Sequence, residues 1–152
     1  MVATAGPAIS DAVAELQETL LHLIWHEKLR FSRELANHQL TIPQFFTLVA
    51  IKRIGQTCTM GQIAETTNQV SATVTGIIDR LVVRGWVRRR RASDDRRTVL
   101  VELTREGQIL LEQIQQAKRA HLQGVFMHFA PEEREQILRM LRRYLSTVQA
   151  EA

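Results

Sequence analysis

The chain has 152 residues, of which 45% are hydrophobic and 24% are charged, and its formal net charge is +4. These proportions suit one folded domain with helical extensions and exclude an intrinsically disordered chain. No apolar run approaches the ~20 residues that cross a bilayer, and no basic segment followed by an apolar one opens the chain. A single cysteine, Cys58, fits a reducing compartment. We therefore expect a cytoplasmic protein.

The positive charge is concentrated in one segment. Between residues 84 and 97 lie seven arginines and two aspartates, a net charge of +5, so the remainder of the chain sums to −1. Arginine also dominates the cations, with 17 Arg against three Lys. Its planar guanidinium suits phosphates, guanine edges and narrow minor grooves. The segment is typical of an electrostatic contact surface for nucleic acid.

The first expected element is a long amphipathic helix from Ser10 to about Asn37. Its apolar residues recur at alternating spacings of four and three: Ile9, Val13, Leu16, Leu20 and Leu23. No element precedes this apolar face, so a partner must cover it, either from this chain or from a second copy.

Two capping boxes predict the next two helices. Thr41 and Gln44 open a helix that we expect to run to about Arg53, before Gly55, and Thr59 and Gln62 have the same spacing. After a turn at residues 68–70, we expect Ser71 to cap a further helix that ends at Gly85. The buried side of that helix is predicted as Val74, Ile77, Ile78 and Leu81. Two helices joined by a tight turn make a helix-turn-helix.

Residues 86–91 and 98–103 are strand-like, and the segment between them is rich in turn residues, which predicts a hairpin directly after the helix-turn-helix. Thr104 then caps a long helix, and Pro131 starts the last one. The expected fold is mainly α with a small β-hairpin, a winged helix-turn-helix. We expect an N-terminal dimerisation helix over 1–38, the DNA-binding domain over 39–103, and C-terminal dimerisation helices over 104–152.

The outward side of the helix after Ser71 carries small or polar residues, as close approach to base edges in the major groove requires. Arginines at the hairpin tip suit a minor groove. Any single Ser or Thr is as readily explained by capping and solvation, and about half of Arg88 to Arg91 by ion pairs or solvent. Asp95 is expected to orient neighbouring arginines. The candidate DNA-binding residues are Ser71, Ala72, Thr73, Thr75, Gly76, Arg80, Arg96 and Arg97.

The segment from about Leu40 to Gly107 resembles the MarR family of bacterial regulators. The matching stretches are Ile63-Ala64, SATVTGIIDRL from Ser71 to Leu81, RGWV from Arg84, DRR from Asp95, and LTREG from Leu103 to Gly107. The resemblance implies an obligate homodimer with intertwined terminal helices that reads a pseudo-palindrome, and repression relieved by a small ligand or oxidant. Gly76 departs from the basic or larger polar residue that many members carry there.

Other candidate sites are weaker. Trp25, His26 and Phe31 could line a pocket for a small-molecule effector, although aromatic residues at helical spacing are more often core. His22 and His26 are four residues apart, but no carboxylate or cysteine is near them in sequence, so we predict no metal site. Cys58 has no basic neighbours and is expected to be a small buried hydrophobe.

No catalytic motif is present, so we expect neither an enzyme nor a cofactor. The leading hypothesis is a dimeric repressor that binds double-stranded DNA and is released by a small ligand. A ligand-independent DNA-binding protein and a winged-helix module that binds proteins are the alternatives.

Overall fold

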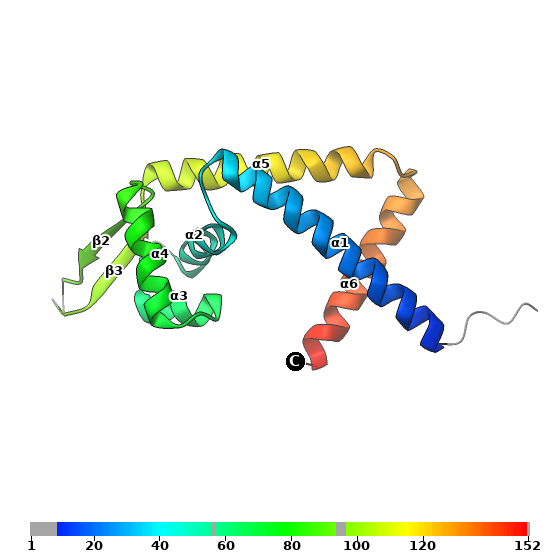
Figure 1. The fold of residues 1–152 in the computed structure, drawn as a ribbon, viewed down its shortest axis with the longest axis horizontal. Coiled ribbons are helices and arrows are strands. Elements are labelled where there is room, and N and C mark those ends of the chain that lie inside the picture. Colours follow the sequence, from blue (N-terminus) through cyan, green and yellow to red (C-terminus); the bar gives the residue numbers. More distant parts are fainter. Residues whose placement is uncertain (1–8, 56, 94–96, 152) are drawn as a thin grey trace, which may run out of the picture. The chain divides into compact units, whose positions relative to one another are not determined.

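The computed structural model describes residues 9–55, 57–93 and 97–151, which divide into two compact units after Leu111. Most of the chain is helical, and a small three-stranded sheet accompanies the helices (Figure 1). The elements are α1 (Ile9–Asn37), α2 (Ile42–Ile54), β1 (Cys58–Thr59), α3 (Met60–Thr67), α4 (Ser71–Val83), β2 (Val87–Arg91), β3 (Val99–Leu103), α5 (Arg105–Phe126) and α6 (Pro131–Glu151).

Both predicted capping boxes are confirmed. At α2, the Gln44 amide donates to the Thr41 hydroxyl at 3.4 Å, and the Thr41 amide donates to Gln44 Oε1 at 2.9 Å. At α3, Thr59 and Gln62 make the same exchange at 3.2 and 2.9 Å. Each box satisfies two backbone groups that a helix N-terminus leaves without partners. The predicted stop of α2 is also confirmed, because Gly55 caps it with φ +140°.

The turn between α3 and α4 lies where the sequence predicts it, but the cap of α4 does not. Asn68 ends α3 in the left-handed conformation, with φ 51° and ψ 44°. Val70 occupies the N-cap position with extended backbone angles, and Ser71 is already the first helical residue, so the prediction that Ser71 caps α4 is wrong. The turn of residues 68–70 therefore already contains the N-cap residue, one position before the Ser71 hydroxyl. As a result, α4 has no side-chain cap.

The predicted hairpin is confirmed within one residue at each end. Strands β2 and β3 pair antiparallel, with Arg89 opposite Val101. A further strand, β1, joins the other edge of β3, where Cys58 faces Val101. Sequence reasoning missed β1, because a strand of two residues carries no alternating pattern and its second residue, Thr59, is already the cap of α3.

The core of the first unit lies among α2, α3, α4 and the sheet (Figure 1). Residues spaced three and four apart in these helices turn inward together, which gives each helix one buried face. The fully buried side chains of this core include Leu35, Leu48, Ile51, Ile63, Val74, Ile78, Leu81 and Val101. The predicted buried face of α4 is confirmed at all four positions.

The end of α4 and the start of α5 are fastened to each other. Gly85 has φ +72°, its amide donates to Val82 O at 2.9 Å, and the Trp86 amide donates to Leu81 O at 3.1 Å, which is a Schellman motif. The Thr104 amide donates to the Trp86 carbonyl at 3.1 Å, and its hydroxyl donates to the Gly85 carbonyl at 2.7 Å.

The same Thr104 hydroxyl accepts a hydrogen bond from the Gly107 amide at 3.1 Å, as predicted for the cap of α5. A Cβ atom at Gly107 would lie 2.1 Å from the Trp86 carbonyl oxygen. The RGW and LTREG stretches are therefore two halves of one junction, in which only glycine fits at residue 107.

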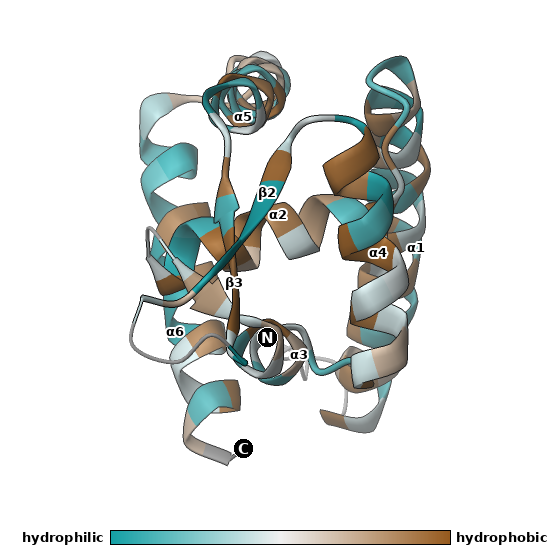
Figure 2. Cartoon of the chain, turned by 90° about the vertical axis from the view of Figure 1, so that its left-hand side faces the viewer, coloured by the Kyte–Doolittle hydropathy of each residue, from teal (hydrophilic) through white to brown (hydrophobic). Residues whose placement is uncertain are grey.

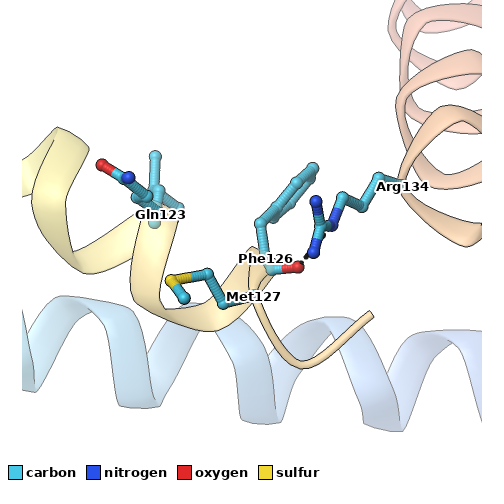
Figure 3. Close-up of a pocket in the computed structure, with 5 residues that line it drawn as sticks. Gln123, Phe126, Met127 and Arg134 are labelled. Atoms are coloured by element: carbon cyan, nitrogen blue, oxygen red, sulfur yellow. Dashed lines mark hydrogen bonds between the residues drawn. The ribbon is translucent and has the colours of Figure 1, made fainter. Parts of the chain in front are cut away.

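The second unit holds the remainder of α5 and α6. Near the turn between them, Arg134 Nε donates to the Phe126 carbonyl oxygen at 2.7 Å (Figure 3). These residues, with Leu122, Gln123 and Met127, line a mostly apolar hollow of about 430 Å³. None of the helices in the described part of the chain is long and apolar enough to cross a membrane.

Candidate nucleic-acid interface

The outward face of α4 is exposed over its whole length, while its other face is buried in the core. All six candidate DNA-binding residues on this helix lie on the exposed face. They are Ser71, Ala72, Thr73, Thr75, Gly76 and Arg80. The structure thus brings them together on one accessible surface, which none of the described residues of the first unit covers.

Two residues on this face, Thr75 and Gly76, offer an approaching molecule no side-chain hydrogen-bond donor. The Thr75 hydroxyl donates to the Ser71 carbonyl at 2.9 Å, so its hydrogen is used within the helix. At Gly76, an added Cβ would meet no atom within 4 Å. The described fold therefore gives no steric reason for glycine here, and the residue leaves the α4 backbone open to an approaching molecule.

The arginines of β2 are largely paired, as the sequence predicts for about half of Arg88 to Arg91. Glu102 Oε1 on β3 lies 2.7 Å from Arg88 Nε and 3.7 Å from Arg90 Nε. Arg89 Nη1 lies 2.6 Å from Asp79 Oδ1 on α4. Because alternate residues of a strand point to opposite faces, Arg88 and Arg90 share one partner and Arg89 has another. In Figure 2 most of β2 has the hydrophilic colour, as its run of arginines requires.

The Arg89–Asp79 ion pair joins the hairpin directly to α4. Asp79 lies on the outward face of the helix, and its carboxylate would repel a DNA phosphate if it had no cation beside it. The pairing offsets that charge and ties the position of β2 to the helix. Sequence reasoning did not single out this pair, since residues ten apart in different elements leave no periodic signal.

At the hairpin tip, only part of the predicted contact set is described. Arg97 is exposed, and the Ala92 amide donates to the Thr98 carbonyl at 3.0 Å, which extends the pairing beyond β2. Arg96 and Asp95 lie outside the described residues. The roles predicted for them stay predictions.

Arg84 is a further cation at this surface that sequence reasoning did not select. Its guanidinium hydrogen-bonds to Gln39 Oε1 and lies 5.6 Å from the centre of the Trp86 ring. A hollow of about 280 Å³ lies beside it, lined by Gln39, Gln44, Asp79, Arg80, Val83, Arg84 and Trp86. The partners of Arg84 hold it at the C-terminal end of α4. The sequence signal that could have selected Arg84 is its position as a basic residue directly before the glycine that ends α4.

The predicted effector residues lie in different surroundings on α1. Trp25 is 60% exposed and His26 is exposed, whereas Phe31 is half-buried, with its ring edge-on to that of Phe45 at 4.9 Å between centroids. A hollow of about 510 Å³ lies where α1 meets the start of α2, lined by Lys28, Ser32, Leu40, Thr41, Ile42 and Pro43. None of the three predicted residues lines it, and their role stays a prediction.

Cys58 is buried, as expected, with 1% of its surface exposed. Its thiol donates to the Val101 carbonyl oxygen at 3.5 Å. Burial raises the pKa of this thiol to about 11, because the thiolate would lose its hydration in the core. Cys58 therefore stays a neutral thiol near pH 7. Among the described residues, no three His, Cys, Asp or Glu side chains gather as metal ligands would.

Comparison with known proteins gives the family. The profile of the MarR family matches residues 38–98. The chain is similar to the HTH-type transcriptional repressor NicR of Pseudomonas putida, with 32% identity over 117 residues that cover 77% of this chain and 73% of NicR. It is also similar to the repressor YetL of Bacillus subtilis, with 34% identity over 80 residues. That match covers 53% of this chain and 48% of YetL, so the matched segment spans about half of that relative.

Solved structures agree with this assignment. A MarR family protein from Bacillus stearothermophilus superposes with a TM-score of 0.83 at 26% identity, over 95% of this chain and 99% of that protein. A mutant of MepR from S. aureus, solved with a bound oligodeoxyribonucleotide, has a TM-score of 0.69 at 25% identity over 87% of this chain and 97% of MepR. The chain belongs to the MarR family and is a winged-helix DNA-binding regulator of transcription.

Proposed function

We propose that the protein binds a pseudo-palindromic DNA operator as a homodimer and represses transcription until a small ligand releases it. The observation that carries this proposal is the exposed face of α4, made of small and polar residues, beside an arginine-rich hairpin. Such a helix fits the major groove, and the hairpin tip with Arg96 and Arg97 would then reach the adjacent minor groove. The name of NicR and the oligonucleotide bound to MepR support DNA binding and repression.

The dimer is supported by apolar side chains that the single chain leaves exposed on its terminal helices. On α1 these include Ile9, Val13, Leu16, Leu23 and Ile24, and on α6 they include Leu138, Leu141, Tyr144, Leu145 and Val148. Apolar patches of this extent are rare on monomers. Two copies that cover them would present two α4 helices, and half-site centres about 10 base pairs apart would suit their two-fold symmetry.

Release by a ligand is supported by the hollow where α1 meets the start of α2, and by Phe31, which directly precedes Ser32, a residue that lines that hollow. A ligand that binds one arrangement of the chain better than another shifts the population toward it. Trp25, His26 and Phe31 stay our candidates for contacts to such an effector.

The test is fluorescence anisotropy on the upstream DNA of the protein's own gene and on a scrambled duplex, across a salt series. We expect tight binding to the upstream duplex alone, with two chains per site and a steep loss of affinity as salt rises. Arg97→Ala should weaken binding about tenfold or more. Arg139→Ala is the matched control, since it removes the same charge from the exposed polar side of α6.

Other outcomes would favour the alternatives. Equal, weak binding to both duplexes would leave only nonspecific electrostatic attraction and contradict the proposal. Selective binding with no response to any small molecule would favour a ligand-independent DNA-binding protein. Full operator affinity in Arg97→Ala would count against the wing contact. Capture of a protein partner without DNA binding would favour a winged-helix module that binds proteins.

A further inference from the structure

The middle of the exposed face of α4 is formed by Ala72, Thr75 and Gly76. These residues are three and four apart, so they lie together on one side of the helix. All three are exposed. The next residue in the same row is Asp79, whose carboxylate is paired with Arg89 at 2.6 Å. A duplex docked on α4 would therefore meet these three residues first.

This middle region has no side-chain hydrogen to donate. Ala72 and Gly76 have no polar side-chain atom, and the Thr75 hydroxyl hydrogen is used on the Ser71 carbonyl at 2.9 Å. In the major groove guanine offers only acceptors, so reading it requires a donor. Ala72 can offer a base edge only a methyl group, and Thr75 can offer a methyl group and the lone pairs of its hydroxyl oxygen.

We infer that α4 reads thymine at the centre of each half-site through its 5-methyl group, by apolar contact with Ala72 and Thr75. Thymine is distinguished in the major groove by this methyl group. Gly76 adds no side chain, so the backbone of α4 can approach closely enough for such contacts. This inference rests on the proposed binding to an operator, and it names the base that the helix recognises.

The edges of the same face carry side chains of other kinds. Val70, just before α4, is 71% exposed and adds an isopropyl group at the N-terminal end of the helix. The residues with donors lie to the sides of the central row, at Ser71, Thr73 and Arg80. Hydroxyl and guanidinium groups suit phosphate contacts, which fix the register of a protein on DNA without reading its sequence.

The first experiment replaces each operator thymine in turn by deoxyuridine, which lacks only the 5-methyl group and keeps every hydrogen-bonding atom. At the thymines that α4 contacts, we expect about a fourfold loss of affinity per methyl group removed. Substitution in both half-sites should then cost about fifteenfold. Thymines elsewhere in the duplex should show no change.

The second experiment uses two nearly isosteric variants, each tested on the thymine and the deoxyuridine duplex. Thr75→Ser removes the methyl group and keeps the hydroxyl that bonds Ser71 O. Thr75→Val keeps a methyl group and removes the hydroxyl. At one thymine position, the uracil penalty should disappear in Thr75→Ser and persist in Thr75→Val, which is the coupling expected of two groups in contact.

The results that would refute this inference differ from those that would refute the proposed function. Selective operator binding with no uracil penalty at any position would overturn this inference and leave the proposed function intact. A uracil penalty that persists in Thr75→Ser would also overturn it, because contact with the Thr75 methyl group could not then account for the penalty. Binding that is equal on operator and scrambled duplexes would refute the proposed function itself.

Discussion

Gly107 shows how closely two elements of this fold approach each other. A Cβ atom there would lie 2.1 Å from the Trp86 carbonyl oxygen, which also accepts the Thr104 amide. We expect Gly107→Ala to lower the free energy of unfolding by about 2–3 kcal/mol, because the backbone must shift to relieve the clash. Thermal denaturation measures this. Gly124→Ala on the same helix is the control: its Cβ meets no atom within 4 Å, so its melting temperature should not fall.

Gly76 lies in the opposite situation. Because an added Cβ meets nothing in the chain, we expect Gly76→Ala to raise the free energy of unfolding by about 0.5–1 kcal/mol. The same methyl group would hold DNA away from the α4 backbone, so operator affinity should fall. Denaturation and anisotropy on one preparation measure both. Gly61→Ala in α3 should leave affinity unchanged, and an affinity gain in Gly76→Ala would contradict the close approach of DNA.

The buried thiol predicts a pH effect on stability. Below pH 9 the Cys58 thiol is protonated in both folded and unfolded chains, since its unperturbed pKa is 9.0. Above that, the unfolded chain releases its proton, while the folded chain holds it up to about pH 11. Stability should therefore fall by about 3 kcal/mol between these values. Denaturant titrations should show a shallower decline in Cys58→Ala, and equal declines in both proteins would contradict the burial effect.

At the scale of elements, the hairpin is fastened to α4 through Arg89 and Asp79 at 2.6 Å. Asp79→Asn removes a negative charge near DNA, so nonspecific affinity should rise. It also frees the hairpin from α4, so the ratio of operator to scrambled affinity should fall. Stability should change by less than about 1 kcal/mol, because the pair is partly exposed. Anisotropy on both duplexes tests this, and an unchanged ratio would mean that the pair does not position the hairpin.

The elements predicted well are those whose signals are local. Thr41 with Gln44, and Thr59 with Gln62, make their bonds within one helical turn, so the sequence alone places them. The outward face of α4 follows in the same way from its helical period. Ser71 misled the assignment of the cap, because a hydroxyl at a helix start marks the boundary only to within a residue.

The features that were missed depend on contacts between distant residues. Strand β1 exists because Cys58 meets Val101, 43 residues later, and Arg84 is held by Gln39, 45 residues earlier. The sequence predicts that some arginines of β2 pair with acidic residues, since both faces of a hairpin cannot contact DNA. It does not predict that Glu102 is the partner of Arg88 and Arg90, because that depends on the strand register.

At the scale of the whole molecule, the proposed dimer makes stability depend on concentration. If folding and association are linked, the melting temperature should rise with protein concentration. Leu141→Glu places a charge on the exposed apolar face of α6, where Leu141 is 57% exposed, and should give monomers that bind DNA weakly. Sedimentation velocity measures this. Ser146→Glu, a matched change of charge on the polar side of α6, should remain dimeric.

The junction of Gly85 and Trp86 with Thr104 and Gly107 also has a mechanical consequence. Two hydrogen bonds and one close approach join the end of α4 to the beginning of α5, and a third hydrogen bond caps α5. Because of these contacts, a rotation of the first turn of α5 would turn α4 with it, and so change how that helix meets the major groove.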